Sequence, residues 1–178
     1  EPKAASPEKP GTAANPYLIS TPAELAWLVN YSITAGNETA GKYYALTNDI
    51  YLNKVSGTTF ETTYNWFHSN TERNNFKGTF DGCGYVIYGL YFNSTLSQRS
   101  GLFPNLGTGA VIKNVGIDNA YINVGSEGNG SAAGAIAAWL DNGVTAPYPV
   151  ISGCYVGENV SIISSSNGTA YSRAGGTL

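Results

Sequence analysis

Residues 76–92 read FKGTFDGCGYVIYGLYF. An aromatic and glycine-rich run stops at Asp81-Gly82-Cys83-Gly84, and an alternating apolar stretch follows it. Glycine and aspartate supply the positive φ angles and the side-chain turn bonds that a tight corner needs. The stretch therefore predicts a corner in a β-scaffold. In this corner Asp81 accepts hydrogen bonds from turn amides, Gly82 and Gly84 take unusual φ angles, and Cys83 is a small half-buried side chain.

A related pattern recurs along the chain, which is typical of repeat architectures. VIYGLYF (86–92), VIKNVGI (111–117) and VISGCYV (150–156) superpose at offsets of 25 and 39 residues. SGLFPNL (100–106) and AGAIAAWL (133–140) form a second set before the later two. Short strands at unequal intervals, with Gly or Asn at corners, predict a parallel β-helix whose coils stack. An antiparallel β-sandwich is the alternative, and it would favour Asn-Gly hairpins at steady spacing.

The chain begins with one expected helix, over residues 22–33. Thr21 and Glu24 form a capping box around Pro22 at the first helical position. Residues 42–53 then alternate and predict a strand. We expect further short strands at 76–80, 85–92, 101–103, 110–117, 120–124, 132–140, 149–156 and 160–163.

At this level of detail the sequence resembles GLUG-type repeat proteins. The resemblance covers roughly residues 11–178 and rests on the ordered segments GTAANPYLISTPAELAWL, GKYYALTNDIYLN, FKGTFDGCGYVIYGLYF, SGLFPNLGTGAVIKNVGI and AGAIAAWL…ISGCYVG. It implies a right-handed parallel β-helix with an N-terminal capping helix, in a bacterial secreted or cell-surface protein. Similar repeats occur beside IgA-specific metallopeptidases and in large adhesins. Cys83 and Pro104 replace residues that are usual in the family, which favours drift in a structural repeat over a preserved active site.

Two parts of the chain differ in composition. Residues 1–14 combine Pro, Ala, Lys and Glu, which predicts a linker or disordered tail. Residues 15–178 form the expected β-helix domain. A further repeat starts at AGGTL (174–178), so we expect the domain to be truncated at its C-terminal end from a longer array.

Charge and motifs argue against several classes of partner and cofactor. Charged residues make up 12% of the chain, and the net charge is −3 with no basic cluster, so we expect no nucleic acid partner. No apolar run is long enough for a membrane helix. We predict no cofactor and no metal, because no ligand spacing such as CxxC, D-x-D-x-D-G or H-E-x-x-H is present.

Aromatic side chains give the better functional indication. The candidate ligand-binding residues share one third of the chain and could stack on sugars or anchor protein contacts; they are Tyr64, Trp66, Tyr85, Tyr88 and Tyr91. Strand alternation predicts that Tyr85 and Tyr91 share a face and that Tyr88 lies on the other.

Catalysis is the competing hypothesis. A polysaccharide-active lyase or glycoside hydrolase would need paired carboxylates, for which Asp49 and Asp81 on neighbouring coils are the candidates. A nucleophilic Cys83 would need a base such as His68, the single histidine. We favour structural turn roles for Asp49, Asp81, Gly82 and Gly84, and we predict two free thiols at Cys83 and Cys154.

The favoured function is a noncatalytic extracellular or cell-surface β-helix module, adhesin-like or stalk-like. It would belong to a larger exported polypeptide and present loops to a glycan or a host surface protein. The expected loops are 54–75, 93–100, 125–131 and 164–173. An accessory domain of a secreted peptidase is a further alternative.

Overall fold

The computed structural model describes residues 3–4, 10–69, 75–96, 98–127, 130–140, 143–167 and 172–175. The single α-helix among these residues, α1 (Pro22–Ala35), is followed by a short 3-10 helix, η1 (Gly36–Thr39). Everything else in regular structure is strand, and nearly all strand pairs are parallel. The prediction of a mainly β parallel solenoid with one N-terminal helix is confirmed.

The strands form parallel sheets, and each coil of the chain contributes strands to these sheets in the same order. The first sheet contains β1 (Lys3–Ala4), β2 (Tyr17–Ile19), β3 (Tyr43–Leu46), β8 (Thr79–Asp81), β13 (Val111–Lys113) and β18 (Val150–Ser152), with β1 antiparallel. The second contains β4 (Ile50–Tyr51), β9 (Val86–Tyr88), β14 (Gly116–Asp118) and β19 (Tyr155–Val156). The third contains β10 (Tyr91–Ser94), β15 (Ala120–Glu127) and β20 (Val160–Asn167).

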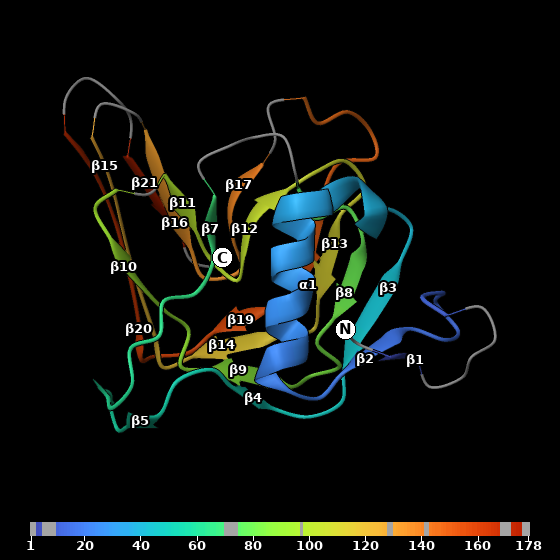
Figure 1. The fold of residues 1–178 in the computed structure, drawn as a ribbon, viewed down its shortest axis with the longest axis horizontal. Coiled ribbons are helices and arrows are strands. Elements are labelled where there is room, and N and C mark those ends of the chain that lie inside the picture. Colours follow the sequence, from blue (N-terminus) through green and yellow to red (C-terminus); the bar gives the residue numbers. More distant parts are fainter. Residues whose placement is uncertain are drawn as a thin grey trace.

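Two further sheets complete each coil. One contains β7 (His68–Ser69), β11 (Arg99–Ser100), β16 (Ser131–Gly134) and β21 (Ser172–Gly175), with β7 antiparallel to β11. The other pairs β12 (Phe103–Leu106) with β17 (Ala137–Leu140). The hairpin of β5 (Val55–Ser56) and β6 (Thr59–Phe60) lies outside the coils. Figure 1 shows α1 lying across the stacked sheets, with β10, β15 and β20 side by side.

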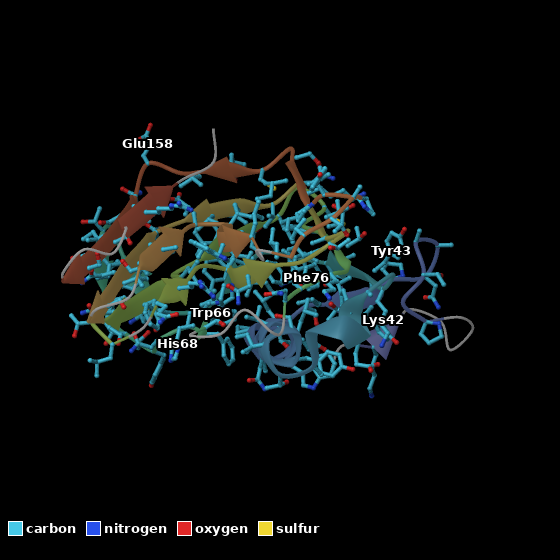
Figure 2. The ribbon with its side chains drawn as sticks, turned by 90° about the horizontal axis from the view of Figure 1, so that it is seen from above. Lys42, Tyr43, Trp66, His68, Phe76 and Glu158 are labelled. Carbon is cyan, nitrogen blue, oxygen red and sulfur yellow. The ribbon has the colours of Figure 1, made fainter. Side chains whose placement is uncertain are left out.

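The core is built from the inward residue of each strand. In the first sheet Tyr44, Phe80 and Ile112 stack in register, and each is at least 98% buried. The α1 residues Leu25 and Leu28 belong to the same buried cluster. The helix therefore covers one end of the stack, and Figure 2 shows it at the edge opposite the last coil.

The helix prediction is confirmed and the observed helix runs two residues further. Glu24 N donates to Thr21 Oγ1 at 3.2 Å, and Thr21 N donates to Glu24 Oε2 at 3.1 Å, which is the expected capping box. These contacts are local, so the sequence pattern alone was sufficient to place the helix start.

The predicted strand bounds were wrong wherever a corner lies inside a strand motif. The chain turns after Leu46, so the expected strand 42–53 is β3 and β4. The stretches 85–92, 110–117, 132–140 and 149–156 divide in the same way, while 101–103 lies mostly in the turn between β11 and β12. Positive φ angles at Gly89, Asn114 and Gly153 produce three of these corners.

The repeat register was right for one pair of motifs and wrong for the other. Val111 pairs with Val150, as the offset of 39 predicts. Val86, however, pairs with Gly116, and Thr79 is the residue that pairs with Val111. Gly89 N donates to Asn119 O, so VIYGLYF (86–92) turns at a different corner from VIKNVGI (111–117).

Much of the expected loop sequence is strand instead. Residues 93–94 end β10, residues 125–127 extend β15 and residues 164–167 extend β20. β15 and β20 pair along all eight residues of each strand, so the backbone groups that face each other between these two strands find partners. The parts of the expected loops at 70–74, 97, 128–129 and 168–171 lie outside the described residues.

Candidate functional site

A groove of about 390 Å³ lies between α1 and the segment that leads into β7. Its lining residues come from α1, from residues 65–68 and from β10; they are Asn30, Ile33, Asn65, Trp66, Phe67, His68, Phe92 and Ser94. Figure 2 shows Trp66 and His68 close together beside the helix, at the end of the stack opposite Glu158. The volume is within the range of small-ligand sites.

Trp66 is held in place on two sides. Its backbone N–H donates to Tyr91 O at 2.7 Å, and its indole Nε1–H donates to Leu102 O at 3.0 Å. The indole also meets the Phe67 ring edge-on, with ring centroids 5.0 Å apart at 75°. Because both the backbone and the indole nitrogen are anchored, the half-buried ring forms a rigid apolar wall.

Asn65 is fixed by the backbone of β10. Its Oδ1 accepts from Asn93 N at 2.9 Å, and its Nδ2 donates to Asn93 O at 3.4 Å. The Asn93 Oδ1 in turn accepts from Asn123 Nδ2 at 3.0 Å. The amide row therefore ties the groove wall to two successive coils.

His68 brings a titratable ring to the groove. Its backbone pairs with Ser100 in β11, and its ring lies 5.7 Å from the Phe92 ring. Partial burial lowers the pKa of His68 from its ordinary value of 6.5. The imidazole is therefore neutral at pH 7, with one nitrogen that donates and one that accepts.

The predicted aromatic residues do not form one surface. Tyr88 stacks on Tyr51, with centroids 4.9 Å apart and an interplanar angle of 10°. Tyr91 stacks on Tyr121 at 5.5 Å and 24°, and Phe60 approaches Tyr91 at 5.2 Å. Each stack covers one face of each of its two rings and joins two successive coils.

The other two predicted tyrosines lie elsewhere. Tyr64 is 75% exposed, and its backbone is held by the Asn53 side chain, whose Oδ1 accepts from Tyr64 N at 2.8 Å. Tyr85 is half-buried and packs against the core. Tyr85 and Tyr91 do not share a face as expected, because the corner at Gly89 interrupts the alternation between them.

Asp81 is held by contacts across two coils. Its Oδ1 accepts from Cys83 N at 2.9 Å and from Asn114 Nδ2 at 3.1 Å, and its Oδ2 lies 2.9 Å from Lys113 Nζ. Burial opposes the charge, but the bonds from Cys83, Lys113 and Asn114 outweigh it and lower the pKa of Asp81. Asp49 Oδ1 accepts from Val86 N at 2.9 Å, which ties the first coil to the second.

The corner itself differs from the expectation in its φ angles. Cys83 at 54° and Gly84 at 86° take positive φ, whereas Gly82 does not. Position 82 requires a glycine for a steric reason, because an added Cβ would lie 2.5 Å from Val115 Cβ. Cys83 is also exposed, where half-burial was expected.

Neither cysteine is arranged as a nucleophile. Both thiols are free, as predicted. Partial burial and the nearby Asp81 carboxylate raise the pKa of Cys83, and burial raises the pKa of Cys154. A raised pKa keeps a thiol protonated at pH 7, and the thiolate is the reactive form.

The sequence predicted Trp66 as a ligand-binding residue, but His68 was considered only as a base for Cys83, and Asn65 and Phe67 were not assigned to a site. Asn65, Phe67 and His68 directly flank it in NWFHS (65–69), which was a usable signal. Asn30 and Ile33 come from α1, and nothing local in the sequence indicates that the helix reaches this segment.

Comparisons with known proteins connect the chain to segments of longer proteins. It is 33% identical over 132 residues to a Gly-rich membrane protein of Evansella cellulosilytica, and 29% identical over 167 residues to halomucin of Haloquadratum walsbyi. The alignments cover 71% and 90% of this chain, but only 13% and 2% of these relatives. No family model and no solved structure matches the chain, so the likeness to GLUG-type repeats stays a prediction.

Two negative findings apply to the described part of the chain. No helix there is long and apolar enough to cross a membrane. No three of its His, Cys, Asp or Glu side chains are grouped so that they could hold a metal ion.

Proposed function

We propose that the chain is a noncatalytic module of a large exported polypeptide, stalk-like or adhesin-like, that contacts glycans at a cell surface. The stacked coils would serve as a rigid support, and the groove beside α1 would make the contact. Distant relationship to short segments of a named membrane protein and of halomucin supports a surface location within a longer chain.

The observation that carries the noncatalytic assignment is the use of the corner carboxylates. Both carboxylates accept hydrogen bonds from the next coil: Asp81 Oδ1 from Asn114 Nδ2 at 3.1 Å, and Asp49 Oδ1 from Val86 N at 2.9 Å. A glycosidase requires one protonated carboxyl as general acid near neutral pH, with a raised pKa. The pKa of Asp81 moves in the opposite direction. These facts favour structural roles for both residues.

A glycan array followed by a reducing-end assay on every bound polysaccharide tests the proposal. Binding without release of reducing ends supports it. Release of reducing ends overturns it in favour of a polysaccharide-active enzyme, and Asp49→Asn and Asp81→Asn would then identify the acid. No binding to any glycan overturns the glycan contact and favours a role beside a secreted peptidase or as a stalk alone.

A further inference from the structure

The groove beside α1 is preorganised. Trp66 is anchored at both its backbone and its indole nitrogen, and Asn65 is anchored to Asn93. Phe67 O accepts from Ser100 Oγ at 2.9 Å, which fixes the next residue of the same wall. A wall that is already ordered loses little conformational entropy when a ligand binds.

The groove also mixes two kinds of surface. The half-buried Trp66 and Phe67 supply apolar ring surface. Asn30, Asn65 and His68 supply amide and imidazole groups. Asn30 and His68 are solvent-exposed, so their polar atoms are accessible to an incoming molecule. A pyranose ring has the same division, with an apolar C–H face and a rim of hydroxyl groups.

The charge of the lining residues restricts the class of sugar that the groove can bind. Among the residues that the structure describes there, none is Lys, Arg, Asp or Glu. An acidic sugar would need a cation to offset the loss of its hydration on binding. An uncharged sugar needs only donors and acceptors, and asparagine and neutral histidine each provide both.

We propose that the groove formed by α1, residues 65–68 and β10 binds a single uncharged pyranose unit. The sugar would lie against the Trp66 indole, with its hydroxyl groups toward Asn30, Asn65 and His68. This assignment rests on the proposed glycan contact and specifies its place and ligand class. The tyrosine stacks on the outer sheets are not part of it, because none of their four residues lines the groove.

Saturation-transfer NMR and titration calorimetry with methyl glycosides of glucose, galactose, mannose and N-acetylglucosamine test the assignment. Methyl glucuronide serves as the charged probe. We expect at least one neutral glycoside to bind with a Kd on the order of 1 mM, as suits a ligand of this size. The glucuronide should bind at least about tenfold more weakly.

Substitutions then locate the site. Asn30→Ala and His68→Ala remove exposed groups, so both variants should stay folded, and each should raise Kd about five- to tenfold. Trp66→Ala should abolish binding, and its circular dichroism spectrum shows whether it folds. Tyr148→Ala is the matched control, because Tyr148 is 68% exposed and lies outside the groove.

The outcomes separate this assignment from the broader function. Array binding that survives Asn30→Ala and His68→Ala would leave the glycan contact standing but overturn the groove assignment. Equal binding of the glucuronide would overturn the uncharged ligand class. A chain that binds no glycoside here and no glycan on the array would overturn both.

Discussion

Two alanine substitutions in the Asp81–Gly84 corner measure different contributions to stability. Gly82→Ala measures the cost of overpacking between coils, and Gly84→Ala measures the cost of a left-handed backbone. At Gly82 an added Cβ would lie 2.5 Å from Val115 Cβ and would also contact the Asn114 carbonyl oxygen. Both atoms belong to the next coil and cannot move aside freely. Overpacking of this kind costs about 1–3 kcal/mol, and contact with backbone places Gly82→Ala near the upper end, at about 3 kcal/mol.

Gly84 presents the opposite case. Its φ is +86°, and nothing lies within 4 Å of an added Cβ. Only the left-handed backbone is then penalised, at about 1 kcal/mol. Gly41→Ala is the matched control, because Gly41 has a φ of +70° and the same open surroundings.

Equilibrium urea unfolding, followed by tryptophan fluorescence, measures all three variants. We expect Gly82→Ala to lower the free energy of unfolding by about 2 kcal/mol more than Gly84→Ala. The melting temperature should fall by about 2–4 °C per kcal/mol for a chain of this size. If Gly84→Ala proved as destabilising as Gly82→Ala, the argument that Gly82 is required for coil-to-coil contact would fail.

Three further predictions concern the core, an ion pair and the thiols. Ile112→Ala should lower the free energy of unfolding by about 2–5 kcal/mol in the same urea assay. Ile151 is 44% exposed in the last coil, so Ile151→Ala should lower it by only about 1 kcal/mol. Equal losses would contradict the coil order. Because the pKa of Asp81 is lowered from 3.8, its ionised form stabilises the fold above about pH 4, and this contribution is lost as the pH falls further. Asp81→Asn should therefore lower the free energy of unfolding by about 1 kcal/mol at pH 7 and make it depend less on pH below about pH 4. An unchanged pH dependence in that range would contradict this role of Asp81. Ellman titration should find two thiols in the denatured, nonreduced chain, with the exposed Cys83 reacting before the partly buried Cys154 in the native state; finding none would mean that the two are paired.

The sequence was most informative where structure depends on neighbouring residues. The capping box at Thr21 and Glu24 placed the helix start, since its hydrogen bonds span three residues. The corner at Asp81 was also recognisable, because an Asx-type bond to Cys83 N needs only local sequence.

Register was harder because the same pattern occurs at two corners of the coil. The corners at Asn114 and Gly89 are different, but each ends the same pattern of two apolar residues, a polar residue and then Asn or Gly. The resulting offset of 25 is shorter than the coil of 32 residues that separates Thr79 from its partner Val111. Only strand pairing distinguishes the two corners.

The groove was the least predictable part. Asn30 and His68 are 38 positions apart, and they meet only because α1 lies against the segment before β7. That placement depends on burial of the apolar helix face in the common core, which is a property of the whole fold.

The stacked tyrosines have a spectroscopic consequence. Tyr51 and Tyr88 come from the first and second coils, and Tyr91 and Tyr121 from the second and third. The ring centroids are 4.9 Å apart in the first pair and 5.5 Å apart in the second, so the ultraviolet transitions of the two rings in each pair couple. Each pair therefore contributes a circular dichroism signal that exists only while its two coils are in contact. Separation of one coil from the next can therefore be followed by this signal without an added label. Variants that lack one of the two pairs assign the remaining signal to a single junction.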